Sequence, residues 1–168
     1  MTAHPIEQVL SALNAAGVRY LVVGGVAVVL HGHLRTTADL DLVVSLEPVN
    51  ARRAIEALTS LGYRPRAPVA AERFAEATER AAWIAEKGLT VFSLWSARLP
   101  SLEVDLFVRE PFDFEQAWER RVTVSLDTTT ATVVALQDLL ALKRQAHRPQ
   151  DLADVEALLA INPAGRTP

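Results

Sequence analysis

Hydrophobic residues in the first third of the chain recur at helical spacing or gather in short runs. Ile6, Leu10 and Leu13 lie three or four residues apart, which is the spacing of one helix face, and Gly17 follows as a stop signal. The run RYLVV is rich in β-branched residues and is typical of a buried strand. This part of the chain is therefore predicted to form helices over 5–16, 26–31 and 48–61 and strands over 19–23 and 39–44.

The rest of the chain continues the mixture of helices and strands. The predicted helices cover 71–87, a short segment around Phe114 and Trp118, 136–147 and 151–160, and the predicted strands cover 89–95, 102–108, 122–126 and 130–134. This mixture predicts an α/β (α+β) fold. We expect one domain over 1–168, with a mixed sheet of about four or five strands, helices packed mainly on one face, and a C-terminal helical element over 134–160.

Two carboxylates stand at the start of the apolar strand predicted over 39–44. Asp39 and Asp41 are two residues apart, so on a strand they point to the same face, about 7 Å apart. Two ionised carboxylates repel each other and are costly to bury, whereas a divalent cation such as Mg²⁺ removes both problems. Asp105 occupies a similar position in LEVDLFV, where Glu103 is a solvated neighbour or a substitute ligand. If the two strands are neighbours, the three aspartates can share one or two metal ions.

A glycine pair, Gly24 and Gly25, separates the strand predicted over 19–23 from the helix that follows. Without Cβ atoms the backbone can approach a ligand closely, and the N–H groups at a helix N-terminus favour a phosphate. A tight strand-to-helix turn without any ligand is the simpler interpretation of a glycine pair taken alone. The surrounding residues match neither the P-loop nor the dinucleotide-binding fingerprint.

Composition and charge exclude several classes of partner and of chemistry. A net charge of −3 and a pI of about 5.8 give no general attraction to nucleic acid or to acidic membranes. The absence of cysteine excludes disulfides, thiolate metal sites and a cysteine nucleophile. The sequence shows no signal-peptide pattern and no apolar run long enough to span a bilayer. The expected compartment is therefore the cytoplasm, with no membrane partner.

Taken together, these motifs resemble those of the DNA polymerase β superfamily of nucleotidyltransferases. They appear in the order VVGG at 22–25, DLDL at 39–42 and VDL at 104–106. The resemblance is strongest to small bacterial members with GG-x-A and R-x-T-x-D-[LI]-D, some related to toxin–antitoxin or abortive-infection proteins and others to antibiotic nucleotidyltransferases. It covers a core over 18–108 and, more weakly, 134–159, where a lysine precedes an Arg-Pro-x-Asp run.

The resemblance implies a role for each matching residue. Asp39 and Asp41 would hold one or two Mg²⁺ ions (or Mn²⁺) that carry the triphosphate of an NTP. Asp105 would be a metal ligand or the base that activates the acceptor hydroxyl. Many relatives have serine at the second turn position, so here the phosphate would rely on backbone N–H groups. The expected nucleotide-binding residues are Gly24, Gly25, Arg35, Thr37 and Lys143.

Some of these residues also have structural interpretations. Arg35 could neutralise the acid cluster instead of clamping a phosphate. Asp151 and Asp154 resemble a capping pair for the helix after Pro149, and they could also orient Lys143 or Arg148.

The predicted activity is metal-dependent transfer of a nucleoside monophosphate from an NTP to a hydroxyl, with release of pyrophosphate, an EC 2.7.7-type reaction. The acceptor could be a protein side chain, an RNA end such as that of tRNA, or a small molecule, and the setting could be a toxin–antitoxin system. The alternative is a module that binds a nucleotide or a partner protein without chemistry, as an antitoxin would; retention of all three acids argues against it. A phosphatase with an aspartate nucleophile is disfavoured, because that nucleophile ends a hydrophobic strand whereas Asp39 begins one after RTTA.

Overall fold

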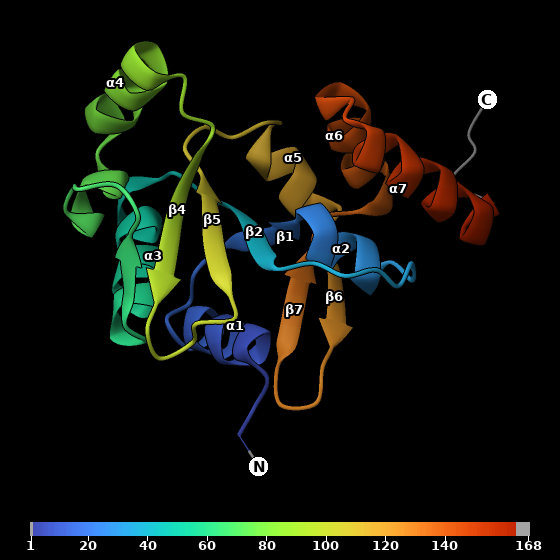
Figure 1. Ribbon diagram of the computed structural model, residues 1–168, viewed down its shortest axis with the longest axis horizontal. Helices are drawn as coiled ribbons and strands as arrows, with labels where there is room; N and C mark the ends of the chain where they lie inside the picture. The colour runs from blue at the N-terminus through green and yellow to red at the C-terminus, as the bar shows by residue number, and fades with distance from the viewer. Residues whose placement is uncertain (1, 164–168) are drawn as a thin grey trace.

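A seven-stranded mixed sheet organises the computed structural model, which describes residues 2–163 (Figure 1). The strand order is β3-β4-β5-β2-β1-β7-β6. Strand β2 pairs in antiparallel fashion with β1 and in parallel fashion with β5, while β1 is parallel to β7. The bounds are β1 Tyr20–Val23, β2 Asp39–Val44, β3 Tyr63–Pro65, β4 Val91–Ser96, β5 Glu103–Phe107, β6 Val122–Ser125 and β7 Thr130–Val133.

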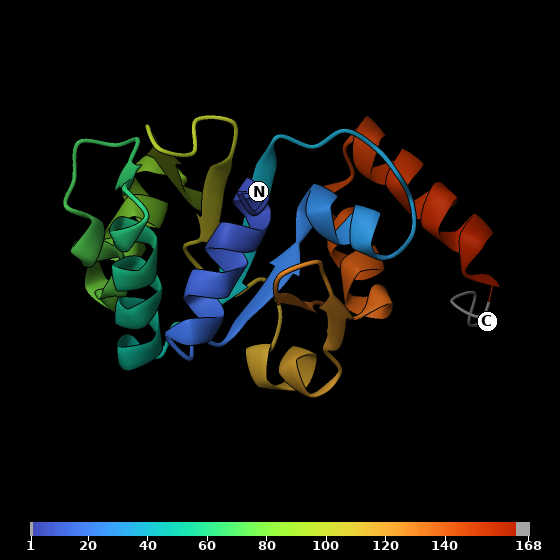
Figure 2. The ribbon, with the colours of Figure 1, turned by 90° about the horizontal axis from the view of Figure 1, so that it is seen from below.

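Seven α-helices and one 3-10 helix pack around this sheet in the described residues. Helices α1 (Pro5–Ala15) and α3 (Pro48–Ser60) contact each other and lie side by side along the sheet (Figure 2). Helices α6 and α7 pack together at the C-terminal end, where α6 also contacts α2. The remaining bounds are α2 Gly24–Leu30, η1 Ala71–Ala75, α4 Ala77–Lys87, α5 Phe114–Glu119, α6 Leu136–Ala146 and α7 Pro149–Ile161.

The two faces of the central strands differ in polarity. Leu42 and Leu106 are completely buried on one face, as are the apolar residues two positions before them. The residues between these positions belong to the opposite face, because side chains alternate along a strand. There Asp39 is exposed, while Asp41 and Asp105 are half-buried. The fold thus keeps one polar, accessible face over β2 and β5.

The predicted mixed fold with C-terminal helices is confirmed, but the predicted count of four or five strands was too low. The segments expected to be extended over 122–126 and 130–134 pair as the hairpin β6–β7. The strand β3 was not predicted, because three residues are too few to show a period of two. It is held at the sheet edge by antiparallel pairing with β4.

Three predicted helices also had wrong boundaries. Helix α2 begins at Gly24, two residues before the start predicted at residue 26, so both glycines belong to its first turn. The helix expected over 71–87 is interrupted at Glu76, whose backbone is extended (φ −91°, ψ 117°). The break lets Phe74 and Trp83 both stack on Phe92, with ring centroids 5.5 and 5.0 Å away. Helix α7 begins at Pro149, two residues earlier than predicted, because the first helical position needs no N–H donor. Across the described residues, no helix has the length and apolar character needed to cross a membrane.

Candidate active site

The three acids predicted to act together lie on two adjacent strands. Strands β2 and β5 are parallel, with Asp41 paired to Asp105 and Asp39 paired to Glu103. Neighbouring strands are about 4.8 Å apart, so the Asp41 and Asp105 backbones are separated by one strand spacing. The expected neighbourhood of the three aspartates is therefore confirmed, and Glu103 extends the acidic row.

The paired carboxylates are placed where ionisation is unfavourable. Burial raises the pKa of Asp41 to about 6, and the charges of Asp105 and Asp39 act in the same direction. Burial also raises the pKa of Asp105, although a hydrogen bond from Ser93 opposes the shift. Within the described part of the chain, the buried Oδ1 of Asp105 has no hydrogen-bond partner. Such a group is costly to bury unless a ligand satisfies it.

The raised pKa of Asp41 predicts a pH-dependent stability of the metal-free protein. A carboxyl whose pKa rises from 3.8 to about 6 on folding stabilises the fold at low pH, and this contribution is lost as pH rises through about 6. The loss is at most about 3 kcal/mol. Urea unfolding in a chelating buffer from pH 4 to 8 should show this decline for the parent and a flatter profile for Asp41→Asn. Equal slopes for both proteins would contradict it.

The first residue of the glycine pair is fixed by the Asp41 carboxylate. Gly24 has φ +65°, a conformation that favours glycine, and any Cβ there would overlap the Asp41 side chain. The register explains this closeness, because Val23, the preceding residue, pairs with Asp41. The strand-to-helix turn and the acid therefore form one continuous surface.

The second residue of the pair, Gly25, lies close to side chains of the loop before β2. A Cβ on Gly25 would lie 2.6 Å from the Thr37 hydroxyl and 3.0 Å from Nη2 of Arg35. The serine that many relatives carry at this position would fit here only if the Thr37 side chain moved. Thr37 Oγ1 instead lies beside the turn, where it donates a hydrogen bond to the carbonyl of Asp39 at 3.3 Å.

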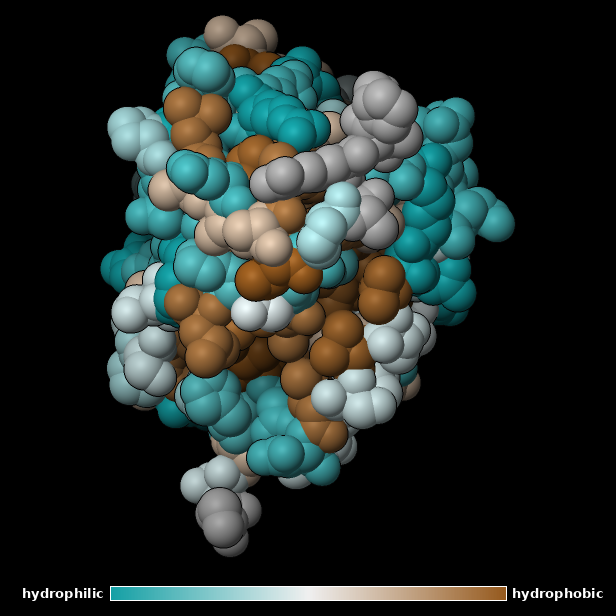
Figure 3. All heavy atoms as spheres, turned by 90° about the vertical axis from the view of Figure 1, so that its right-hand side faces the viewer, coloured by the Kyte–Doolittle hydropathy of each residue, from teal (hydrophilic) through white to brown (hydrophobic). Residues whose placement is uncertain are grey.

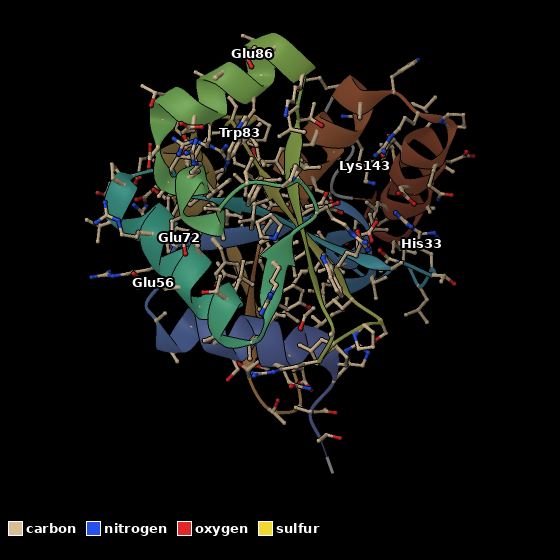
Figure 4. All side chains as sticks on the ribbon, turned by 60° about the vertical axis from the view of Figure 1, so that its left-hand side comes forward. His33, Glu56, Glu72, Trp83, Glu86 and Lys143 are labelled. Atoms are coloured by element: carbon tan, nitrogen blue, oxygen red, sulfur yellow. The ribbon has the colours of Figure 1, made fainter. Side chains whose placement is uncertain are left out.

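A buried cluster of charges joins this loop to the C-terminal helices. Lys143 of α6 donates to Asp151 Oδ1 at 3.0 Å and lies 2.9 Å from Asp154 Oδ2. Arg35 pairs with the same Asp154 through Nε at 3.0 Å and Nη2 at 3.1 Å. The side chains of Lys143, Asp151 and Asp154 are all 6% exposed or less. In Figure 4, Lys143 projects from α6 toward the interior between the sheet and α7. We call these four residues the buried charge cluster.

The contacts within the cluster show which structural role Arg35, Asp151 and Asp154 each have. Arg35 contacts Asp154, not the acids of β2, so it does not neutralise the carboxylate row directly. Capping applies only to Asp151, which accepts the backbone N–H of Arg148 at 3.3 Å, since Asp154 lies inside α7. Burial alone would raise the pKa of Asp154, but hydrogen bonds from Lys143 and Gln150 hold it below its ordinary value. Both aspartates orient Lys143.

Two cavities flank α2. The first has a volume of about 290 Å³ and reaches Gly24, Asp41 and Lys143. The second, about 660 Å³, is lined by Val26, Val29 and Leu30 of α2 and reaches Arg35 and Thr37. Figure 3 views the molecule from the side of α7 and shows hydrophobic side chains gathered around a hollow. Only the first cavity touches a member of the carboxylate row.

The residues that sequence reasoning missed are mainly apolar. Phe107, Leu142 and Ala146 line the first cavity but carry no motif. Arg148 was considered only as a partner of the aspartates, yet it also lines this cavity and binds Asp151 at 2.6 Å. The Arg-Pro-x-Asp run was the available signal for Arg148, whereas nothing in the local sequence distinguishes a cavity wall from core.

The fold and the order of the motifs agree with the resemblance to nucleotidyltransferases. The chain belongs to a family described as "Nucleotidyltransferase of unknown function (DUF6036)", which matches residues 4–163. No curated protein matches the sequence.

Solved structures share this fold at low sequence identity. The lincosamide antibiotic adenylyltransferase LnuA, bound to lincomycin, is 14% identical with a TM-score of 0.61, over 96% of this chain and 98% of that chain. ANT(2″)-Ia, in complex with adenylyl-2″-tobramycin, is 13% identical with a TM-score of 0.57, over 92% of this chain and 86% of that chain. A putative nucleotidyltransferase from Thermotoga maritima is 11% identical with a TM-score of 0.55, over 92% and 90%.

Proposed function

We propose that this protein transfers a nucleoside monophosphate from an NTP to a hydroxyl acceptor and releases pyrophosphate. The observation that carries the proposal is the pairing of Asp41 with Asp105 directly beside the Gly24 turn. A nucleotide-binding module without chemistry would need a cation at the phosphates, but it would have no use for a second half-buried acid in register with the first.

The acids suit a divalent metal, for which we propose one or two Mg²⁺ ions, with Mn²⁺ as a substitute. The buried Oδ1 of Asp105 lacks a donor among the described residues, and repulsion within the row favours a cation. In this part of the chain no group of three or more acids or histidines is arranged to hold a metal by itself. Mg²⁺ is commonly held by one or two carboxylates, with phosphate oxygens and water completing its shell. The proposed ligands are Asp39, Asp41 and Asp105.

In the proposed reaction, Asp105 acts on the acceptor and the residues around the Gly24 turn bind the triphosphate. When bound, the metal neutralises charge on the triphosphate. The acceptor oxygen forms a bond to the α-phosphorus, the bond from that phosphorus to the bridging oxygen breaks, and pyrophosphate leaves. Asp105 receives the acceptor proton. The triphosphate lies along the backbone N–H groups of Gly24 and Gly25, with Thr37 beside it and Arg35 and Lys143 supplying positive charge.

Several classes of molecule carry a hydroxyl that could act as the acceptor. Two structural neighbours are named as complexes with lincomycin and adenylyl-2″-tobramycin, so small molecules are the first class to test. Protein hydroxyls and tRNA ends come next, and a cognate toxin or antitoxin partner is the proposed setting for either. Incubation with each labelled NTP, Mg²⁺ and each acceptor class should release pyrophosphate and label one acceptor. Mg²⁺-dependent NTP binding without release in any mixture would favour the binding module.

Thr37 provides a test of the phosphate subsite. We expect Thr37→Val to raise the KM for NTP about tenfold, because one hydrogen bond to a charged phosphate is lost, while Thr37→Ser stays close to the parent. In Gly25→Ser/Thr37→Gly, a serine hydroxyl takes the space vacated by Thr37 and should recover part of the loss. Equal KM values for Thr37→Val and Thr37→Ser would remove Thr37 from the site.

A further inference from the structure

Strand β6 forms one edge of the sheet, and its outer side is open. Of the described elements, β7 alone packs extensively against it. In Figure 1, no described helix lies along the outer side of its lower part. The strand reads VTVS, without charge or proline, and Val122 is 40% exposed. An unprotected edge of this kind is a template for pairing with another strand.

The opposite edge of the sheet, β3, is built differently. It is only three residues long, its Arg64 is exposed, and it ends at Pro65. Short length, charge and proline are the devices by which natural sheets keep their edges from pairing. The chain therefore protects one edge of its sheet and leaves the other edge available.

The hydrogen bonds of the β6–β7 hairpin show which backbone groups of β6 are free. The N–H of Leu126 donates to the carbonyl of Thr129 at 2.8 Å, so the backbone groups of residue 126 point toward β7. This direction alternates along an antiparallel strand, so Thr123 and Ser125 present their N–H and C=O groups outward. Among the described residues no further strand pairs with these groups.

We infer that β6 pairs with β6 of a second copy of this chain, in antiparallel orientation about a two-fold axis at Val124. In this register Thr123 of each copy exchanges both backbone hydrogen bonds with Ser125 of the other copy, which uses all of the free groups. The contact is self-complementary, so it closes with two copies. It joins the two sheets into one continuous sheet.

The side chains that this register brings together are complementary. On one face Val122 lies opposite Leu126 of the second copy, and Val124 lies opposite its own counterpart. Val124 and Leu126 already pack against the core, so the exposed Val122 extends an apolar row. At each end Arg121 lies opposite Asp127 of the second copy, and both are exposed. Such a pair adds little affinity but favours the antiparallel orientation, because parallel strands would bring like charges together.

Two double variants that differ at one position test this register. Thr123→Lys/Ser125→Lys places a lysine opposite a lysine in both cross-strand pairs, whereas Thr123→Lys/Ser125→Glu places a lysine opposite a glutamate. Both positions are exposed in the single chain, so both variants should keep the fold, which circular dichroism checks. Sedimentation velocity over a concentration series measures the mass of each protein against the chain mass of 18.3 kDa.

The parent and Thr123→Lys/Ser125→Glu should both reach twice the chain mass as concentration rises. Thr123→Lys/Ser125→Lys should need a concentration at least about tenfold higher, because like charges directly opposite each other destabilise a strand pair. In the parent, hydrogen exchange of the Thr123 and Ser125 amides should slow with rising concentration, because pairing protects these two N–H groups.

Three outcomes would overturn the inference: a parent that stays monomeric, a lysine–lysine variant that dimerises like the parent, or a lysine–glutamate variant as weak as the lysine–lysine one. If the lysine–lysine variant does not fold, amide exchange decides, and rates at Thr123 and Ser125 that do not change with concentration would overturn the inference. Strands β1 and β7 separate β6 from the acids of β2, so these outcomes do not bear on the proposed function.

Discussion

Asp41→Asn is expected to abolish nucleotidyl transfer while leaving the metal-free protein at least as stable as the parent. Transfer should fall by about 10²–10⁴-fold, the range that a positioned catalytic group supplies. Stability should be kept or should rise above pH 6, because the substitution removes a half-buried charge that faces Asp105 and Asp39. The measurements are pyrophosphate release and thermal melts, each with and without Mg²⁺ and NTP.

Ligand-induced stabilisation distinguishes this role from a structural one. Mg²⁺ plus NTP should raise the Tm of the parent by linkage and should do so much less for Asp41→Asn. Asp127→Asn, an exposed acid in the turn between β6 and β7, is a matched control and should behave like the parent. A destabilised Asp41→Asn variant that keeps the nucleotide response would refute the catalytic assignment.

Asp154→Ala should be among the most destabilising single substitutions in the chain. Asp154 is completely buried and is shared by Arg35 and Lys143, so its removal leaves two cations with half of their counter-charge. Removing one partner from a buried ion pair costs about 3–5 kcal/mol. Urea unfolding at pH 7 should measure a loss of this size.

Two further variants test whether the expected destabilisation by Asp154→Ala is due to the burial of its ion pairs. Glu115→Ala breaks the exposed pair between Arg19 and Glu115 and should change the free energy of unfolding little, because solvent screens such pairs. Asp154→Leu combined with Lys143→Met replaces charge by apolar volume and should be less destabilising than Asp154→Ala. A cost for Asp154→Ala no larger than that for Glu115→Ala would mean that water reaches the cluster.

Local sequence was sufficient for the elements that carry a clear period or a clear motif. The strand with Asp39 and Asp41 and the helix over 5–16 both have strong local patterns, so their boundaries were predicted within a residue. The pairing of Asp41 with Asp105 could be anticipated only through the resemblance, because the two residues are far apart in the chain.

The features that were missed depend on tertiary contacts. The break at Glu76 is set by the packing of Phe74 and Trp83 on Phe92, which no window of local sequence contains. The ion-pair partner of Arg35 was missed for the same reason, because Asp154 is more than a hundred residues away in the chain. Sequence patterns pointed to the acids proposed for catalysis more readily than to the residues that hold those acids in place.

The buried charge cluster has a consequence for how sequences of this family can diverge. Arg35 belongs to the loop before β2, whereas Lys143 and Asp154 belong to α6 and α7, so the two ends of the chain share one set of charges. In a chimera that takes its C-terminal helices from a relative, Arg35 lacks its carboxylate partner unless the relative has an acid at the position of Asp154. Positions 35, 143 and 154 should therefore vary together among homologues, although they are far apart in the sequence.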